Sequence, residues 1–433
     1  MSHEVSVVVR YRKAVTYGVH ALLAALQASG VECELRHGTS PEETAAQITA
    51  SGGDRVLVLW SFYSPDAEAM AAELAAVRAL ADGPHVLHIA GGVHATAEPQ
   101  HVLDSGWDLA GIGEGESTIV ALVTALREDA ELTTVPGLAV RDHDGVALRT
   151  RPAPQLPLDA HRSFPSGARR HVGPIELTRG CRYTCRFCQT PFMFGGQFRH
   201  RSVASVVEHV RGMREEFGLR DVRFITPTSL SYGAPGPDAD LDAVEELLAS
   251  VQAELPGDGR IFFGSFPSEV RPEHVTPEAM AMLRRYVAND NIIIGAQSGS
   301  DRILAASGRG HGAGPVRDAV RIAVEHGFRP NVDFMFGMPG EDEADQDASL
   351  RLADDLVELG ARIHTHTFMP LPGTPWRDAD PAFIPVETMR RLDRLAQRGE
   401  AYGHWRRQAE HSTRLAETAK AYPRRTRRRR TDG

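Results

Sequence analysis

Three of the four cysteines in this 433-residue chain stand close together. Cys181, Cys185 and Cys188 have the spacing Cys-x3-Cys-x2-Cys, with the aromatic Phe187 between the last two. Thiols grouped in one short loop predict metal ligation rather than disulfides. Three thiolates can each bind one iron of a 4Fe–4S cluster, which leaves the fourth iron without a protein ligand. A zinc knuckle is the alternative, but a structural zinc site normally has four protein ligands, and the remaining Cys33 is distant in the sequence.

The segment that contains the cysteines, Glu176 to Cys188, resembles the signature loop of the radical S-adenosylmethionine (SAM) superfamily. The resemblance implies a partial (β/α)6 barrel in which the open iron chelates the amino and carboxylate groups of SAM. It also implies that an electron from the cluster cleaves the sulfonium, which gives methionine and a 5′-deoxyadenosyl radical. An electron donor such as flavodoxin or ferredoxin is the partner that this chemistry requires.

A later segment, residues 296–304, resembles the fourth-strand segment of the methylthiotransferase-like and cobalamin-dependent branches of the superfamily. This likeness implies that Gln297 and Ser298 lie beside the bound nucleoside. It also implies that Arg309 meets the methionine carboxylate of SAM. The alternative for Ser298 is a plain strand-end turn followed by a helix start, and Arg309 could equally have a structural role.

Two further strand ends supply candidates for SAM binding. Residues 333–341 resemble the fifth-strand segment that packs on adenine, where Gly337 would allow close approach of the backbone. Ser268 and Glu269 follow the third strand, where such enzymes usually place polar contacts to the ribose or the amino group. A plain loop role is the alternative for Ser268 and Glu269.

Two histidines share one face of a predicted strand at residues 363–368. Side chains of a strand alternate between its faces, so His364 and His366 point the same way. If that face points into the barrel, one of them could touch substrate or cofactor. The alternative for each is a core histidine with satisfied hydrogen bonds.

The N-terminal third alternates strand and helix signals. Short β-branched or apolar runs at residues 5–9, 55–59, 86–90 and 109–112 are separated by helical stretches. This alternation predicts a doubly wound parallel sheet. Ligands of such sheets bind beyond the carboxyl ends of the strands. The segments that follow these strands are residues 60–64, 91–96 and 111–116.

These strand-end segments resemble the cobalamin-binding domain that precedes the radical domain in a large branch of the superfamily. The resemblance implies that the glycines make room for cobalamin and that the other residues line the same crevice; the candidates are Ser61, Gly91, Gly92, Gly113 and Glu114. The lower-ligand pattern Asp-x-His-x-x-Gly of many cobalamin domains is absent. A degenerate domain that no longer binds cobalamin is the alternative.

The expected domain order follows from these segments. It is a cobalamin-binding-like domain (1–130), a connector rich in Pro, Asp and Arg (131–168), the radical SAM barrel (169–376) and a helical C-terminal region with a basic tail (377–433). The six barrel strands are expected at residues 175–178, 222–226, 261–265, 292–297, 332–336 and 363–368. Six strands with helical crossovers between them predict a partly closed barrel.

Composition limits the partners and the location. A net charge of −9 argues against nucleic-acid binding over the whole surface. The arginine run after Pro423 is interpreted as a solvated tail, with an anionic partner such as RNA or a leader peptide as the alternative. No apolar stretch reaches the roughly 20 residues of a membrane span, and no signal peptide is visible. We therefore expect a cytoplasmic location.

Together these features predict a cobalamin-dependent radical SAM enzyme. The expected reaction is methylation of an unactivated carbon, or of a phosphorus centre, in a peptide or small-molecule substrate. A cyclisation or rearrangement without methyl transfer is the alternative reaction. A sensor that binds cluster and cobalamin without catalysis is the alternative class.

Overall fold

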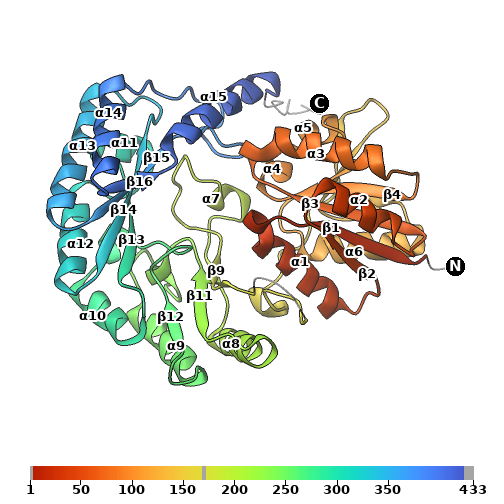
Figure 1. The fold of residues 1–433 in the computed structure, drawn as a ribbon, viewed down its shortest axis with the longest axis horizontal. Helices are drawn as coiled ribbons and strands as arrows, with labels where there is room; N and C mark the ends of the chain where they lie inside the picture. The colour runs from red at the N-terminus through yellow and green to blue at the C-terminus, as the bar shows by residue number, and fades with distance from the viewer. Residues whose placement is uncertain (1–2, 168–171, 424–433) are drawn as a thin grey trace, which may run out of the picture.

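The computed structural model describes residues 3–167 and 172–423, which form two α/β units side by side (Figure 1). The first unit is built on a seven-stranded sheet of order β2-β1-β3-β4-β5-β6-β7. Its first five strands in this order pair in parallel, which confirms the predicted doubly wound class, and the last two are added antiparallel. The strands are β1 (Val5–Arg10), β2 (Glu34–Gly38), β3 (Arg55–Ser61), β4 (Val86–Gly91), β5 (Leu109–Gly111), β6 (Leu138–Arg141) and β7 (Ala147–Arg149).

Helices cover both faces of this sheet, because alternate strand residues point to opposite faces. Val7 and Val9 of β1 pack in one apolar cluster with α1 and α6, whereas Val8 packs in another with α2 and α3. A strand that is buried on both faces is apolar at nearly every position, which explains the continuous run of β1. The helices are α1 (Thr16–Ser29), α2 (Pro41–Thr49), α3 (Ala67–Leu80), α4 (Val93–Ala97), α5 (Pro99–Asp104) and α6 (Glu116–Glu128).

The hairpin β6–β7 lies inside the stretch that the sequence predicts as a connector, residues 131–168. Leu138 and Ala139 of β6 are fully buried, and Ala139 pairs with Ala110 of β5. The connector therefore begins later than expected, because its first apolar residues extend the edge of the N-terminal sheet. Its remaining part, up to residue 167, contains no further strand among the described residues.

The second unit is a partly closed barrel made of two parallel sheets, β12-β11-β8 and β13-β14-β15-β16. Single bridges join them, among them Val270 with Ile294. All six predicted barrel strands are present, and the first is divided into β8 and β9, which pairs with β10. The strands are β8 (Ile175–Glu176), β9 (Thr178–Arg179), β10 (Arg199–His200), β11 (Asp221–Ile225), β12 (Arg260–Phe262), β13 (Asn291–Gln297), β14 (Arg329–Phe336), β15 (Arg362–Thr367) and β16 (Ala401–Gly403).

Strand β16 comes from the C-terminal region that the sequence predicts as helical. It pairs in parallel with β15 and places Tyr402 beside His364. Gly403 permits this close approach: its φ is +137°, and a Cβ there would collide with the carbonyl oxygen of Thr365. Helices α14 and α15 flank the strand, so most of the described C-terminal region is helical as expected.

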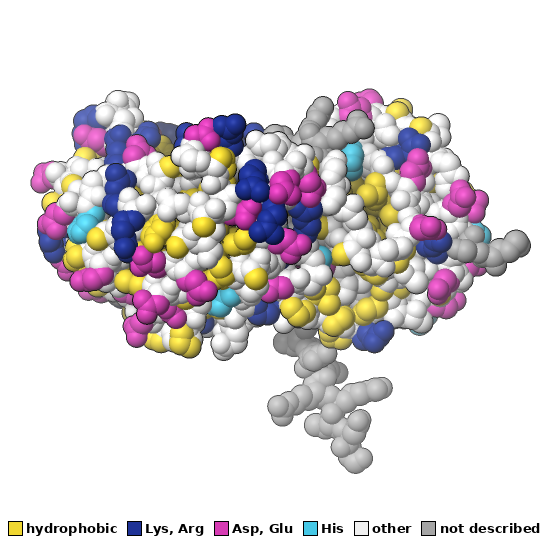
Figure 2. All heavy atoms as spheres, turned by 90° about the horizontal axis from the view of Figure 1, so that it is seen from below, with side chains coloured by type: hydrophobic (Ala, Val, Ile, Leu, Met, Phe, Trp, Pro, Cys, Tyr) yellow, Lys and Arg dark blue, Asp and Glu magenta, His cyan; other side chains and the backbone are white. Residues whose placement is uncertain are grey.

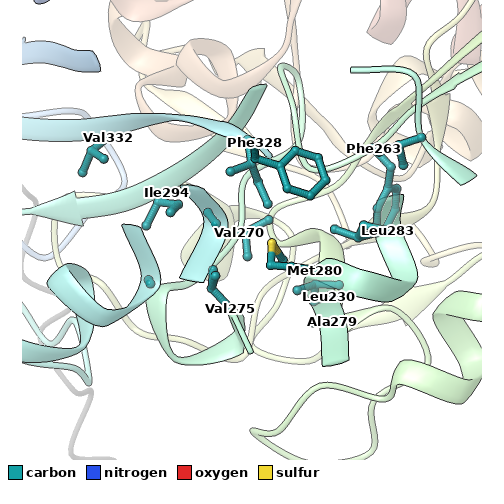
Figure 3. Packing of buried hydrophobic residues seen from close by; sticks show 14 of the residues in the cluster. Leu230, Phe263, Val270, Val275, Ala279, Met280, Leu283, Ile294, Phe328 and Val332 are labelled. Atoms are coloured by element: carbon teal, nitrogen blue, oxygen red, sulfur yellow. The ribbon is translucent and has the colours of Figure 1, made fainter. Parts of the chain in front are cut away.

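Helices on the outside of the barrel enclose one large apolar core. Figure 3 shows part of it, where Phe263, Met280 and Leu283 pack near Val270 and Phe328. The helices of this unit are α7 (Thr190–Met193), α8 (Val203–Phe217), α9 (Leu241–Glu254), α10 (Pro277–Tyr286), α11 (Asp301–Ala306), α12 (Gly314–Glu325), α13 (Glu343–Glu358), α14 (Val386–Gln397) and α15 (Trp405–Ala421).

The surface bears on the predicted partners. None of the described helices has the length and apolar character needed to cross a membrane. On the face seen in Figure 2, Lys and Arg side chains are interspersed with Asp and Glu rather than gathered into one wide basic patch. The arginine-rich tail lies outside the described residues, so its role stays a prediction.

Candidate active site

The cysteine loop follows β9 and is fixed at several points. Cys181 N donates to the carbonyl oxygen of Gly195 at 3.1 Å, and Arg186 N donates to that of Ser307 at 2.8 Å. Gly180 has a φ of +79°, and a Cβ there would collide with the carbonyl oxygen of Gln197. The loop therefore has a defined shape, which a side chain at position 180 would disrupt.

Of the three thiols, those of Cys181 and Cys185 are buried and that of Cys188 is half-buried. Burial raises the pKa of Cys181 to about 11, and the neighbouring Cys188 and Cys185 add to this rise. Burial also raises the pKa of Cys188. Neighbouring thiolates repel one another, so ionisation of all three requires positive charge close by. One such charge is the Arg309 guanidinium, whose Nη1 lies 3.7 Å from Cys185 Sγ. A set of three sulfur donors beside a guanidinium fits a 4Fe–4S cluster with one open iron.

Three of the predicted SAM-binding residues converge on Gly295 of β13. Arg309 Nη2 donates to the Gly295 carbonyl oxygen at 2.7 Å. A Cβ at Gly295 would collide with the same Arg309 nitrogen, and it would lie 3.1 Å from Gln297 Nε2 and 3.3 Å from Glu269 Oε2. Arg309, Gln297 and Glu269 thus pack closely around Gly295, where only a glycine fits, next to Cys185.

Gln297 has an unusual backbone. Its φ is +72°, and the register between β13 and β14 shifts at Gly295 and Gln297. Non-glycine residues with such a φ cost of order 1–3 kcal/mol and cluster at functional sites. The bulge and the positive φ aim Gln297 toward Gly295 and Arg309 rather than along the strand.

Glu269 connects this group to a second polar cluster. Its side chain is accessible to solvent, yet desolvation by the surrounding protein, and then the Asp333 carboxylate, raises its pKa to about 7. Arg309 and His364 act in the opposite direction. Asp333 Oδ1 lies 2.9 Å from His364 Nδ1, and the donor atoms of Asp333, His364 and His366 lie within 4.8 Å of one another.

The two predicted serines are engaged in local hydrogen bonds. Ser298 is fully buried, and its Oγ lies 3.2 Å from Ser349 Oγ and accepts from Ser300 N at 3.1 Å. Ser268 Oγ donates to the carbonyl oxygen of Ser265 at 3.1 Å and accepts from the backbone of the same turn. In this structure both hydroxyls therefore have partners within the protein, Ser268 in its own turn and Ser298 also toward α13.

Gly337 ends β14 with a φ of +80°. Its carbonyl oxygen accepts from Ala382 N at 3.0 Å, and a Cβ would lie 3.3 Å from a carbon of Ile384. Its N–H donates to Glu341 Oε2 at 2.5 Å. In this structure, the absence of a side chain at Gly337 therefore lets residues 382–384 pack closely against its backbone.

Four of the predicted cobalamin-binding residues lie at the carboxyl ends of neighbouring strands in the N-terminal unit. Ser61 ends β3 and pairs with Gly91 at the end of β4. Gly92 has a φ of +91°, and a Cβ there would lie 3.2 Å from Ser61 Oγ. Gly113 has a φ of +78° and no atom within 4 Å of the position of a Cβ. The carboxyl ends of these strands are therefore a suitable place for a large planar cofactor.

Glu114, the fifth of these residues, faces the barrel instead. Its Oε2 lies 2.8 Å from Arg179 Nη1, and its Oε1 contacts Arg199. Arg179 also binds Glu116 and Glu176, each at 2.7 Å. The Arg179, Glu114, Glu116 and Glu176 side chains are each at most 10% exposed, so this is a buried ion cluster between the two units.

Sequence reasoning missed part of the site. Asp333, Arg179 and Arg199 were not singled out, and Arg271, which donates to the Arg309 carbonyl oxygen at 2.8 Å, was not noticed. The alternation of His364 and His366 on one strand was the available signal for the Asp333 cluster. No local signal marks Arg179 or Arg199, because their partner Glu114 is 65 and 85 residues away.

The fold and the site together define a two-domain cofactor protein: a barrel with a three-thiol metal loop, facing a doubly wound domain with a glycine-lined edge. Residues 175–378 match the family described as the Radical SAM superfamily, and residues 4–123 match the B12 binding domain. The chain therefore carries a radical SAM domain with a B12 binding domain in front of it. These domains imply a 4Fe–4S cluster, SAM and cobalamin as cofactors.

Known proteins with a similar sequence or fold were found. An uncharacterized methyltransferase from Pyrococcus horikoshii is 25% identical over 302 residues, which cover 67% of this chain and 62% of that protein. The radical SAM methyltransferase TsrM from Kitasatospora setae, with cobalamin and a 4Fe–4S cluster bound, is 20% identical with a TM-score of 0.68, over 87% of this chain and 74% of TsrM. The radical enzyme OxsB, with aqua-cobalamin and SAM bound, is 16% identical with a TM-score of 0.62, over 81% of this chain and 52% of OxsB. The two structural likenesses concern the fold.

Proposed function

We propose that this protein is a cobalamin-dependent radical SAM methyltransferase. The observation that carries the proposal is the ion cluster around Arg179, two residues before Cys181. It binds Glu114 and Glu116, which flank the glycine-rich edge of the N-terminal sheet. A cluster and a cobalamin at these two places would flank one substrate, which is what methyl transfer to a radical centre requires.

The residues have separate tasks in this proposal. Cys181, Cys185 and Cys188 hold three irons as thiolates. Arg309 binds the SAM carboxylate, and Gln297 donates to the nucleoside from its bulged position. When bound, the cluster supplies the electron that cleaves SAM, and cobalamin supplies the methyl carrier.

Several neighbouring residues have supporting tasks. Glu269 accepts a hydrogen bond from the amino group of SAM. Ser268 and Ser298 shape the turns that hold Glu269 and Gln297, and Gly337 shapes the end of β14. Ser61, Gly91, Gly92 and Gly113 line the cobalamin edge, while Glu114 joins the two domains.

The substrate is proposed to be a small molecule or a peptide. TsrM has been solved with tryptophan and a SAM analogue bound, which supports the small-molecule class. A reduced flavodoxin or ferredoxin is the proposed electron donor. The chain spans 62% of the length of its methyltransferase relative, so parts of that protein have no counterpart in the match.

The test uses SAM with a labelled methyl group and the reduced protein loaded with cluster and cobalamin. We expect label on cobalamin together with S-adenosylhomocysteine, and 5′-deoxyadenosine from a second SAM. Formation of 5′-deoxyadenosine without any label on cobalamin would contradict methyl transfer and favour a cyclisation or rearrangement. If SAM is neither cleaved nor demethylated, the catalytic proposal is wrong and the sensor interpretation stands.

A further inference from the structure

Asp333, His364 and His366 lie together on one face of two adjacent strands. Asp333 of β14 pairs in register with His364 of β15, and His366 follows two positions later on the same face. The neighbouring residues on the other face of β15, Ile363 and Thr365, are fully buried, whereas the two histidines are half-buried. The histidines therefore reach solvent on the face of the sheet opposite to the Ile363 core.

His364 has a defined tautomer. Its Nδ1 lies 2.9 Å from Asp333 Oδ1, and a carboxylate oxygen can only accept, so Nδ1 carries the hydrogen. The ring stacks on Tyr402 with centroids 4.4 Å apart and planes 8° apart, which fixes its orientation. In the neutral form of this ring, the lone pair is consequently on Nε2.

His366 has the opposite tautomer. Thr367 N donates to Gln408 Oε1 at 3.0 Å, which assigns the amide oxygen of Gln408. The amide nitrogen of Gln408 must then donate to His366 Nδ1, 3.2 Å away. Burial lowers the pKa of His366 to about 4, so its ring is neutral and the hydrogen is on Nε2.

These hydrogen bonds speak against a metal site. Two histidines and a carboxylate with donor atoms within 4.8 Å could hold a divalent ion. However, a metal ligand needs a free lone pair, whereas Nε2 of His366 carries a hydrogen and its Nδ1 is occupied by Gln408. The pair offers one acceptor, His364 Nε2, and one donor, His366 Nε2–H, on rings whose centroids are 4.1 Å apart.

The pair is adjacent to the candidate SAM site. The Glu269 carboxylate interacts electrostatically with both His364 and Arg309, and Arg309 contacts Cys185. We propose that His364 and His366 form a polar subsite for the substrate, which binds a planar group with a donor beside an acceptor, such as the cis amide of a lactam. That the ligand is the substrate rests on the proposed function; the donor and acceptor pattern rests on the hydrogen bonds alone.

The test compares three probes of similar size: 2-piperidone, which has an N–H beside a carbonyl; N-methyl-2-piperidone, which lacks the N–H; and cyclohexanone. Saturation-transfer NMR and calorimetry measure their binding to the protein loaded with cluster and cobalamin. We expect 2-piperidone to bind at least about tenfold more tightly than the other two, because a site left with an unpaired polar group discriminates strongly. Equal binding of 2-piperidone and N-methyl-2-piperidone, or no binding of 2-piperidone, would overturn the proposal.

Variants separate the subsite from general damage. His364→Phe keeps the stacking on Tyr402 but removes the Nε2 acceptor, so it should abolish the preference for 2-piperidone. His326→Phe is the matched control, since His326 is half-buried at the end of α12 and should leave the preference unchanged. Melting temperatures report whether each variant is folded.

Zinc binding tests the metal alternative. If the wild type binds zinc stoichiometrically and His364→Phe does not, the residues form a metal site and the proposal is overturned.

A second measurement reads the tautomers directly. Two-bond proton–nitrogen correlations of protein with nitrogen-15-labelled histidine should show a hydrogen on Nδ1 of His364 and on Nε2 of His366. His364→Phe and His366→Phe assign the two signals, and the reverse pattern would overturn the proposal. Neither measurement needs a reduced cluster. Lactam selectivity without methyl transfer would therefore refute only the proposed function, and methyl transfer without lactam selectivity would refute only the subsite.

Discussion

Arg179 lies two residues before Cys181, and its Nη1 is 2.8 Å from Glu114 Oε2 in the other domain. The same guanidinium binds Glu116 and Glu176, so one buried cation serves three carboxylates. This contact joins the loop that follows β5 of the N-terminal sheet directly to the cysteine loop. The relative position of the two proposed cofactors thus depends on it.

The first prediction concerns this ion cluster. Arg179→Gln removes the positive charge that three buried carboxylates share. Removing one partner of a buried ion pair costs about 3–5 kcal/mol, because the other charge stays buried without compensation. We expect a loss of this size in the free energy of unfolding, measured by urea denaturation. Arg220→Gln, which removes the exposed pair with Asp258, is the control and should change stability little. An equal effect of the two substitutions would show that the Arg179 cluster is not structurally important.

A second prediction concerns Gly295. Gly295→Ala places a methyl group against Arg309 and close to Gln297 Nε2, so the Arg309 guanidinium must shift from its present position. We expect at least about tenfold weaker SAM binding to the cluster-loaded protein, because displaced polar contacts cost about 1–3 kcal/mol. Gly18→Ala in α1 is the control, since nothing lies within 4 Å of its Cβ position. Unchanged SAM affinity in Gly295→Ala would mean that the residues packed around Gly295 do not bind SAM.

The backbone of Gln297 gives a third prediction. Gln297→Ala and Gln297→Gly both remove the side chain, but only glycine relieves the positive φ of 72°. The glycine variant should therefore be more stable than the alanine variant by about 1 kcal/mol. Both should bind SAM more weakly than the wild type. An alanine variant as stable as the glycine variant would show that the strain is absent.

The sequence anticipated the parts of the site that are local in the chain. The cysteine spacing, and the strand ends that carry Gln297 and Glu269, are contiguous patterns, and the structure brings these residues together. The role of Glu114 could not be predicted, because its partners are 65 and 85 residues away. Strand β16, a short piece that pairs only in the tertiary structure, was missed for the same reason.

The fourth prediction concerns acid stability. His209 is buried, and its Nε2 accepts from Ser163 N at 2.8 Å. Burial lowers its pKa to about 3, compared with an unfolded value of 6.5. The unfolded chain thus binds this proton more readily, and stability falls as the pH drops below 6.5.

Between pH 7 and pH 5, His209 alone should cost about 2 kcal/mol in the free energy of unfolding, at 1.36 kcal/mol for each unit of pKa difference. His209→Gln can still accept from Ser163 but does not titrate, so urea denaturation at the two pH values should show a smaller loss for this variant. An identical loss in both proteins would assign the acid sensitivity to other groups.

The central claim is that Cys181, Cys185 and Cys188 hold a 4Fe–4S cluster whose fourth iron is free to bind SAM. The most direct measurement is the Mössbauer spectrum of protein reconstituted with iron-57, recorded before and after addition of SAM. The account predicts that about one quarter of the iron signal shifts when SAM is added, because one iron of four lacks a thiolate. A spectrum in which all four irons stay unchanged, or a preparation that takes up zinc in place of the cluster, would contradict it.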